Sequence, residues 1–184
     1  MKGIVFSELC EMVDHVFGPD MMDDVIDMCE LESEGAYTAV GTYCHGEMIQ
    51  LVTALSEKSG LPAQDLVFKY GEYLFTRFYE MKPQFFKDKP TSFDFLESVD
   101  GHIHVEVKKL YNDAELPEFS TQRPDDRTMI MTYRSKRPFA DLAAGLIRGC
   151  VDHYKENVTI DAVDNNEGEY FGRIFTLKKH VSSA

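Results

Sequence analysis

Two histidines, His102 and His104, stand one residue apart in a stretch that predicts an amphipathic helix from Thr91 to Tyr111. Imidazoles on a helix can bind one metal together when they are three or four residues apart, but not at this spacing. With about 100° per residue, His104 falls on the apolar side and His102 on the polar side. The pattern therefore places one imidazole in the core and the other in water.

The helix has a clear predicted start, because Pro90 disfavours an earlier helical turn and Thr91 or Ser92 can cap the first N–H groups. Its expected apolar side carries Phe93, Leu96, Ile103, Val107 and Tyr111, and its expected polar side carries Asp94, Ser98, His102, Glu106 and Lys109. A buried histidine on such a helix is usually a hydrogen-bonded core residue. This pattern alone leaves the role of His104 open.

A second group of polar residues follows a predicted strand, Thr128 to Arg134. Tyr133, Ser135 and Arg137 alternate and share one face if the chain stays extended. Two hydroxyls and a guanidinium can converge on carboxylates, with the arginine as the strongest partner. An ordinary solvent-facing strand end would show the same triplet.

Together, Ile103-His104-x-Glu106-Val107 and Tyr133-x-Ser135-x-Arg137 resemble the motifs of the heme nitric oxide/oxygen-binding (H-NOX) family. The opening Met1-Lys2-Gly3-Ile4 and the pair Leu116-Pro117 extend the resemblance over essentially the whole chain. It implies that His104 is the proximal iron ligand of heme b and that Tyr133, Ser135 and Arg137 bind the heme propionates. It also implies that Pro117 presses on the heme, although a proline entering a strand is equally consistent with the sequence.

The aromatic segment 68–79 is a candidate lining for a flat cofactor, although plain core packing explains it too. The residues expected in the heme pocket are Val5, Leu74, Phe78, Leu96, Val107, Pro117, Leu142 and Leu146.

The resemblance also predicts which gas is bound. Oxygen-binding relatives place a tyrosine five residues after the arginine, where this chain has Leu142, and a supporting asparagine where it has Leu74. Oxygen on ferrous heme carries partial negative charge and is favoured by a hydrogen-bond donor, so the resemblance implies a sensor that binds nitric oxide and CO but no stable O₂. Asp141 is the one nearby polar residue, and an ionised carboxylate only accepts.

In this family nitric oxide is expected to weaken the bond to the proximal histidine. Release of helix 91–111 would then shift two subdomains against each other. Nothing in the chain resembles a cyclase or kinase domain. The expected partner is a separate histidine kinase or a cyclic-di-GMP synthase or phosphodiesterase.

The length of 184 residues predicts one domain, 1–184, with a helical subdomain at about 1–62 and a heme-holding α+β subdomain at 63–184. The fold class is α+β: a helical N-terminal part packs on a C-terminal antiparallel sheet with flanking helices, with heme between them. Predicted helices cover 3–17, 20–30, 43–60, 62–79, 91–111 and 138–154, and a hairpin joins 158–163 to 170–178.

The net charge of −13 argues against nucleic acid, and no apolar run is long enough to span a membrane. The acids gather in 20–34 and 161–169, as solvated surface or as a docking surface for a basic partner. The N-terminus does not resemble a signal peptide, and the scattered Cys10, Cys29, Cys44 and Cys150 suit a reducing compartment. We expect a cytoplasmic protein.

Two other functions compete with the heme sensor. The first is a small hydrolase that uses Asp100, His102 and His104, although no nucleophile elbow or metal cluster accompanies them. The second is a heme-free protein-interaction domain.

Overall fold

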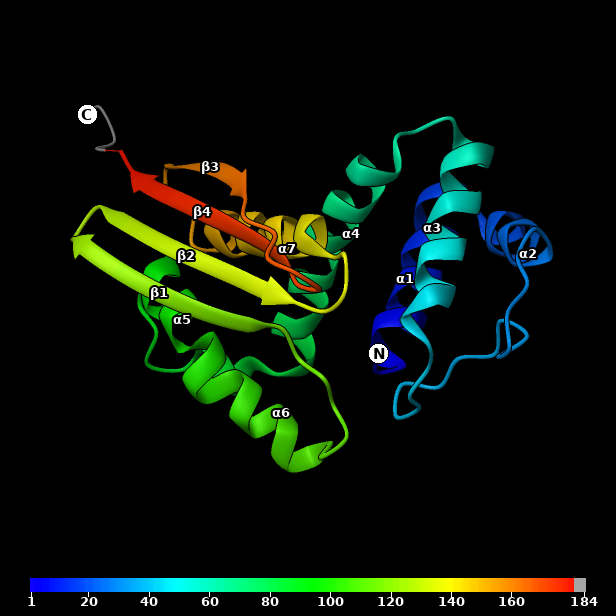
Figure 1. The fold of residues 1–184 in the computed structure, drawn as a ribbon, viewed down its shortest axis with the longest axis horizontal. Helices are drawn as coiled ribbons and strands as arrows, with labels where there is room; N and C mark the ends of the chain where they lie inside the picture. Colours follow the sequence, from blue (N-terminus) through cyan, green and yellow to red (C-terminus); the bar gives the residue numbers. More distant parts are fainter. Residues whose placement is uncertain (181–184) are drawn as a thin grey trace.

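Helices make up most of the first half of the chain, and an antiparallel sheet dominates the second half (Figure 1). The computed structural model describes residues 1–180. The early helices are α1 (Ile4–Phe17), α2 (Pro19–Asp27), α3 (His45–Ser59) and α4 (Ala63–Met81). These bounds agree with the predicted ones to within a few residues, and α4 runs through the aromatic segment without interruption. None of the described helices has the length and apolar character needed to cross a membrane.

The sheet has the strand order β1-β2-β4-β3, and every neighbouring pair is antiparallel. Its strands are β1 (Glu118–Asp125), β2 (Thr128–Ser135), β3 (Val158–Asp164) and β4 (Phe171–Lys179). The predicted alternation in β2 is confirmed, because Met129, Met131 and Tyr133 are all buried. The predicted α+β class with a C-terminal antiparallel sheet is therefore confirmed.

Helix α7 (Ala140–His153) crosses α4 at very short range. A Cβ at Gly145 would stand 2.0 Å from the carbonyl oxygen of Phe68, and one at Gly71 would stand 2.5 Å from that of Leu142. Only glycine fits at these two positions. These two glycines therefore permit the close contact between the two helices.

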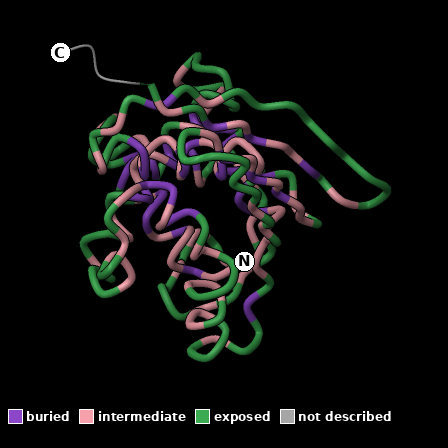
Figure 2. The backbone as a smooth tube through the Cα atoms, turned by 90° about the vertical axis from the view of Figure 1, so that its left-hand side faces the viewer, coloured by how far each residue is buried: buried purple, intermediate pink, exposed green. Residues whose placement is uncertain are grey.

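Apolar side chains form two clusters rather than one continuous core. Figure 2 marks the buried stretches of the backbone. The first joins α1, α2 and α3 to one side of α4, and the second joins the sheet to α5 (Ser92–Ser98) and α7. Helix α4 serves both, since Leu74 belongs to the first cluster and Phe75 to the second. Leu146 packs against both clusters. The line between them, which we call the seam, is the natural place for a group held by both halves.

The predicted single helix 91–111 is wrong in its middle. The chain forms α5 (Ser92–Ser98), a π-helical segment η2 (Val99–His104) and then α6 (Val105–Leu110). Gly101, in the middle of η2, has a low helix propensity, which makes a local change of winding inexpensive. π-Helical turns are rare and are frequent at functional sites. Because a π-turn holds more residues, the predicted helical phase does not carry through to α6.

The segment 82–90, between α4 and α5, contains the short 3₁₀ helix η1 (Pro83–Phe86). The ring of Phe86 stacks on Phe95, with centroids 4.3 Å apart. This stacking ties the segment to α5. The sequence showed only the two flanking prolines.

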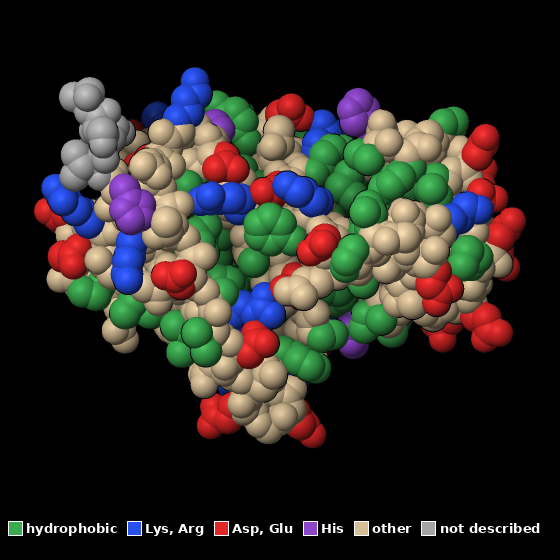
Figure 3. Space-filling model, turned by 90° about the horizontal axis from the view of Figure 1, so that it is seen from above, with side chains coloured by type: hydrophobic (Ala, Val, Ile, Leu, Met, Phe, Trp, Pro, Cys, Tyr) green, Lys and Arg blue, Asp and Glu red, His purple; other side chains and the backbone are tan. Residues whose placement is uncertain are grey.

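Acidic side chains gather at the end of the molecule that carries α2, on the right in Figure 3. This region contains Asp20, Asp23, Asp24 and Asp27. Lys58 of α3 forms an ion pair with Asp24, and this contact compensates part of the charge.

Candidate functional site

His104 is the last residue of η2 and is largely buried, with a side-chain exposure of 16%. Its Nδ1 is buried and has no hydrogen-bond partner. The nearest carboxylate oxygen, Oδ1 of Asp100, lies 3.5 Å away, which is close enough for attraction but outside hydrogen-bond geometry. The His104 ring also faces Phe119, with centroids 5.8 Å apart. A buried polar atom without a partner in the chain is free to bond a group from outside it.

Burial lowers the pKa of His104, and this effect outweighs the opposing attraction of Asp100. The imidazole is therefore neutral at pH 7, as a metal ligand must be. His102 is exposed, and its ring lies near Phe85 at 6.2 Å. The predicted separation of the two histidines is confirmed, even though the helix that carries them is not regular.

Tyr133, Ser135 and Arg137 are brought together by local hydrogen bonds. Strand β2 ends at Ser135, so Arg137 does not continue the strand face but lies in the turn toward α7. The Ser135 hydroxyl accepts from the Arg137 backbone N–H at 3.1 Å, and the Tyr133 hydroxyl donates to the Arg137 carbonyl at 3.3 Å. The two hydroxyls hold the backbone from which the guanidinium projects.

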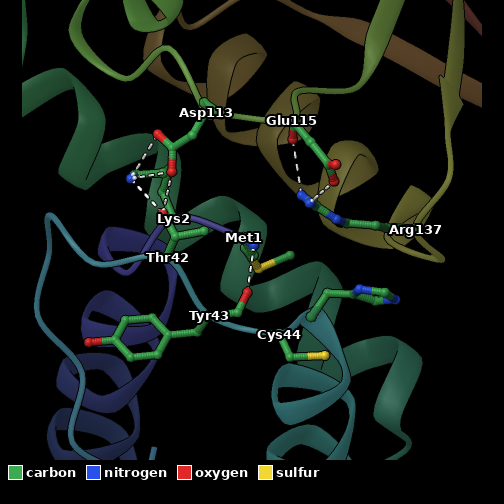
Figure 4. Close-up of a pocket in the computed structure, with 10 residues that line it drawn as sticks. Met1, Lys2, Thr42, Tyr43, Cys44, Asp113, Glu115 and Arg137 are labelled. Carbon is green, nitrogen blue, oxygen red and sulfur yellow. Dashed lines mark hydrogen bonds and ion pairs between the residues drawn. The ribbon is translucent and has the colours of Figure 1, made fainter.

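The Arg137 guanidinium reaches a pocket of about 290 Å³ that lies between the N-terminal residues and the 113–115 segment (Figure 4). Its Nη1 donates to the backbone carbonyl of Glu115 at 3.0 Å, and its Nη2 pairs with the Glu115 carboxylate. The pKa values of the Met1 amine and of His45 at this pocket are both lowered, mainly by burial and secondly by the positive charge of Arg137. The sequence offered no signal for Glu115, because nothing local links it to an arginine 22 residues away.

A second polar cluster lines the same pocket (Figure 4). Asp113 accepts from the Thr42 hydroxyl at 2.8 Å and lies 3.4 Å from the Lys2 ammonium. Lys2 also donates to Thr42 at 2.7 Å and sits over the ring of Tyr111 at 4.8 Å. We call Lys2, Thr42 and Asp113 the latch, since they connect the N-terminal residues to the chain that follows α6.

The apolar residues predicted for the heme pocket have three different environments. Leu74 is fully buried in the first cluster and Leu96 in the second. Val5, Phe78 and Leu142 are only partly buried and pack against the first cluster, and Leu146 packs against both clusters. Val107 and Pro117 are half-buried and lie outside both clusters.

These features fit a heme. His104 offers a neutral imidazole whose Nδ1 is unpartnered, and the seam offers incompletely covered apolar side chains. Arg137, with the two hydroxyls that position it, offers a charged polar group. Heme needs these three elements: an axial ligand, an apolar slot and polar groups for its propionates.

Comparison with known proteins agrees with this arrangement. A family model described as Haem-NO-binding matches residues 2–162. This chain belongs to that family. A crystal structure of the Fe(II) unliganded H-NOX protein from K. algicida is 34% identical, covers 99% of this chain and 98% of its own, and superimposes with a TM-score of 0.92.

A solution structure of the H-NOX protein from Shewanella woodyi, in the Fe(II)CO ligation state, is 41% identical. It covers 100% of this chain and 97% of its own, with a TM-score of 0.84. The S. oneidensis H-NOX protein in the Fe(II)NO state has the same fold at 21% identity, with a TM-score of 0.86 over 98% of this chain and all of its own. No curated protein matches the chain.

The predicted family, fold and heme cofactor are therefore confirmed, because H-NOX domains are heme-binding gas-sensor domains. The hydrolase alternative loses its geometric support. His102 is exposed near Phe85 while His104 is buried beside Phe119, so the two rings do not share a site. Residues 1–180 also contain no group of three or more His, Cys, Asp or Glu side chains that could hold a metal ion.

Proposed function

We propose that this H-NOX domain is a nitric oxide sensor in which His104 is the proximal iron ligand and Tyr133, Ser135 and Arg137 hold the heme propionates. The observation that carries this assignment is the neutral, largely buried imidazole of His104 with an unpartnered Nδ1. Arg137 would supply the charge-assisted contact to a propionate. Tyr133 and Ser135 would position it through the backbone contacts described above.

The apolar slot would be formed by side chains from both sides of the seam. Leu146 of α7 packs against both clusters, and Leu142 of α7, Val5 of α1 and Phe78 of α4 are partly buried against the first cluster. Leu74 and Leu96 would provide the fully buried floor. Val107 and Pro117 would join the lining from the chain around α6.

The proposed gas preference rests on the lack of free hydrogen-bond donors at Leu74 and Leu142 and at two polar side chains near them. Leu142 and Leu74 carry no donor. The Tyr70 hydroxyl donates to the Val5 carbonyl, and Asp141 accepts from Arg173 and from Gln64 at 3.2 Å. A bound O₂, which carries partial negative charge, would find no free donor among these groups. Nitric oxide and CO need little such help.

Heme would be held by His104 and would supply an iron that binds nitric oxide and then holds His104 less tightly. The chain supplies the part that responds. His104 ends the π-helical segment, beyond which α6 has no buried residue. In the latch, Asp113 connects the chain after α6 to Lys2 and Thr42. A shift of α6 would therefore displace the residues next to the N-terminal helices.

The output would be the activity of a separate signalling enzyme. A histidine kinase or a cyclic-di-GMP synthase or phosphodiesterase is the class that the family resemblance suggests. Its identity can be tested by co-purification with the heme-loaded domain, with and without nitric oxide. Asp113→Asn should reduce the nitric oxide dependence of that interaction, because it removes the charged partner of Lys2.

Spectra of the ferrous protein with each gas test the proposed selectivity. We expect complexes with nitric oxide and CO, and no stable O₂ complex. Leu142→Tyr should raise O₂ affinity about tenfold, since a hydrogen bond in a dry pocket is worth about 1.4 kcal/mol or more. Leu142→Phe is the matched control, because it adds the same ring without the hydroxyl. An air-stable oxy spectrum of the unmodified protein would refute the selectivity.

A further inference from the structure

The guanidinium of Arg137 is not free in this structure, because Glu115 occupies two of its nitrogens (Figure 4). We propose that the Glu115 carboxylate is a built-in competitor for Arg137, so that it limits how firmly the protein retains heme. The inference rests on the proposed role of Arg137 in propionate binding. It assigns a function to a residue outside the family motifs.

The two contacts from Glu115 differ in kind. The backbone carbonyl accepts from Nη1 at 3.0 Å and fixes the guanidinium without adding charge. The carboxylate pairs with Nη2 from the solvent side, and the Glu115 side chain is 78% exposed, while that of Arg137 is 16% exposed. The carboxylate can therefore rotate into water while the carbonyl contact stays in place.

Competition follows from the donors that Glu115 already occupies, because a bidentate propionate contact needs a parallel pair of N–H groups and both Nη1 and Nη2 of Arg137 are bonded to Glu115. A propionate that used Nη2 would place a second negative charge beside Glu115, and the two carboxylates would repel each other. Asp113, the other carboxylate at this pocket, is held by Thr42 and Lys2 instead. Glu115 is thus the group that a propionate has to displace.

The test measures the rate at which the heme-loaded protein loses heme to an excess of apomyoglobin. Glu115→Gln keeps the size and the backbone carbonyl but removes the charge, and we expect heme loss to slow about two- to fivefold, the range set by a solvent-exposed ion pair. Glu118→Gln is the matched control, because Glu118 is also exposed and pairs with a different arginine, Arg134, at 3.0 Å. Its rate should equal that of the unmodified protein.

A double variant separates pairing from a general charge effect. In the Arg137→Ala background, Glu115→Gln should change the rate little, because the shared partner is gone. Slowing of equal size in that background, no slowing in Glu115→Gln alone, or faster heme loss would each overturn the proposal. Failure of the propionate assignment would look different, since Arg137→Ala would then lose heme no faster than the unmodified protein.

Discussion

Helices α5 and α6 belong to one helical run, but the protein holds them in opposite ways. In α5, Ser92, Phe93, Phe95 and Leu96 are all buried. In α6 no residue is buried, and Leu110 is 63% exposed. His104 lies between them, at the end of the π-helical segment. The proposed iron ligand therefore stands where a firmly packed helix gives way to a loosely packed one.

Polar contacts strengthen the same contrast. Glu156 accepts from the backbone N–H and hydroxyl of Ser92 and pairs with Lys179 at 2.9 Å, which ties the start of α5 to β4. The polar partner of Lys109 in α6 is Glu106 of the same helix. Segments with few buried contacts open at lower free energy than the core. A change at His104 would therefore move α6 more easily than α5.

The sharpest test of this comparison is the residue at the junction. We expect His104→Ala to lose the heme Soret band and added imidazole to restore it, because a free imidazole can occupy the vacated space beside the iron. His102→Ala should keep the spectrum of the unmodified protein, since that side chain is exposed. Heme loss in His102→Ala with retention in His104→Ala would reverse the assignment.

Substitutions of apolar side chains should also distinguish α5 from α6, through the free energy of unfolding. Phe93 is 0% exposed, and we expect Phe93→Ala to lower the free energy of unfolding by about 3–5 kcal/mol, because it leaves a cavity. Leu110→Ala in α6 should stay within about 0.5 kcal/mol, as exposed substitutions usually do. Urea denaturation of both variants measures the difference. Equal losses would mean that α6 packs as firmly as α5.

The sequence correctly predicted which side chains are buried where periodicity and local chemistry agree. The alternation of Met129, Met131 and Tyr133 predicted the buried face of β2, and the opposite environments of His102 and His104 were also predicted. The π-helical turn was missed because its winding depends on contacts made after folding, with Gly101 as the only local sign. The pairing of Glu115 with Arg137 and the latch were missed for a similar reason. They join residues that only the tertiary fold brings together.

The N-terminal cap of α5 gives a smaller expected effect. The Thr91 hydroxyl accepts from the backbone N–H of Asp94 at 3.2 Å, which satisfies one of the free donors of the first turn. We expect Thr91→Ala to lower the free energy of unfolding by about 1 kcal/mol. Thr91→Ser keeps the hydroxyl and should lose much less. Helix α6 continues directly from η2 and has no capping side chain of its own. We therefore expect a stability loss from a cap substitution at the start of α5 and no corresponding site in α6.

The smallest effect concerns how each helix responds to acid. Hydrogen bonding from the Thr91 hydroxyl, with a smaller contribution from Arg123, lowers the pKa of Asp94 in α5. A carboxyl with a lowered pKa in the folded state stabilises the protein above its unfolded pKa, about 4, and this contribution disappears as the pH falls through the folded value.

Asp94→Asn should therefore cost less than about 1 kcal/mol at pH 7, since the group is partly exposed, and the difference from the unmodified protein should shrink below about pH 4. Urea denaturation across this pH range measures it. Glu106→Gln in α6 is the control: hydrogen bonding from Lys109 lowers the pKa of Glu106 too, but this partner lies on the same helix, and the Glu106 side chain is 38% exposed against 30% for Asp94. If Glu106→Gln changed the pH dependence of the unfolding free energy more than Asp94→Asn does, the conclusion that α5 is held more firmly than α6 would be contradicted.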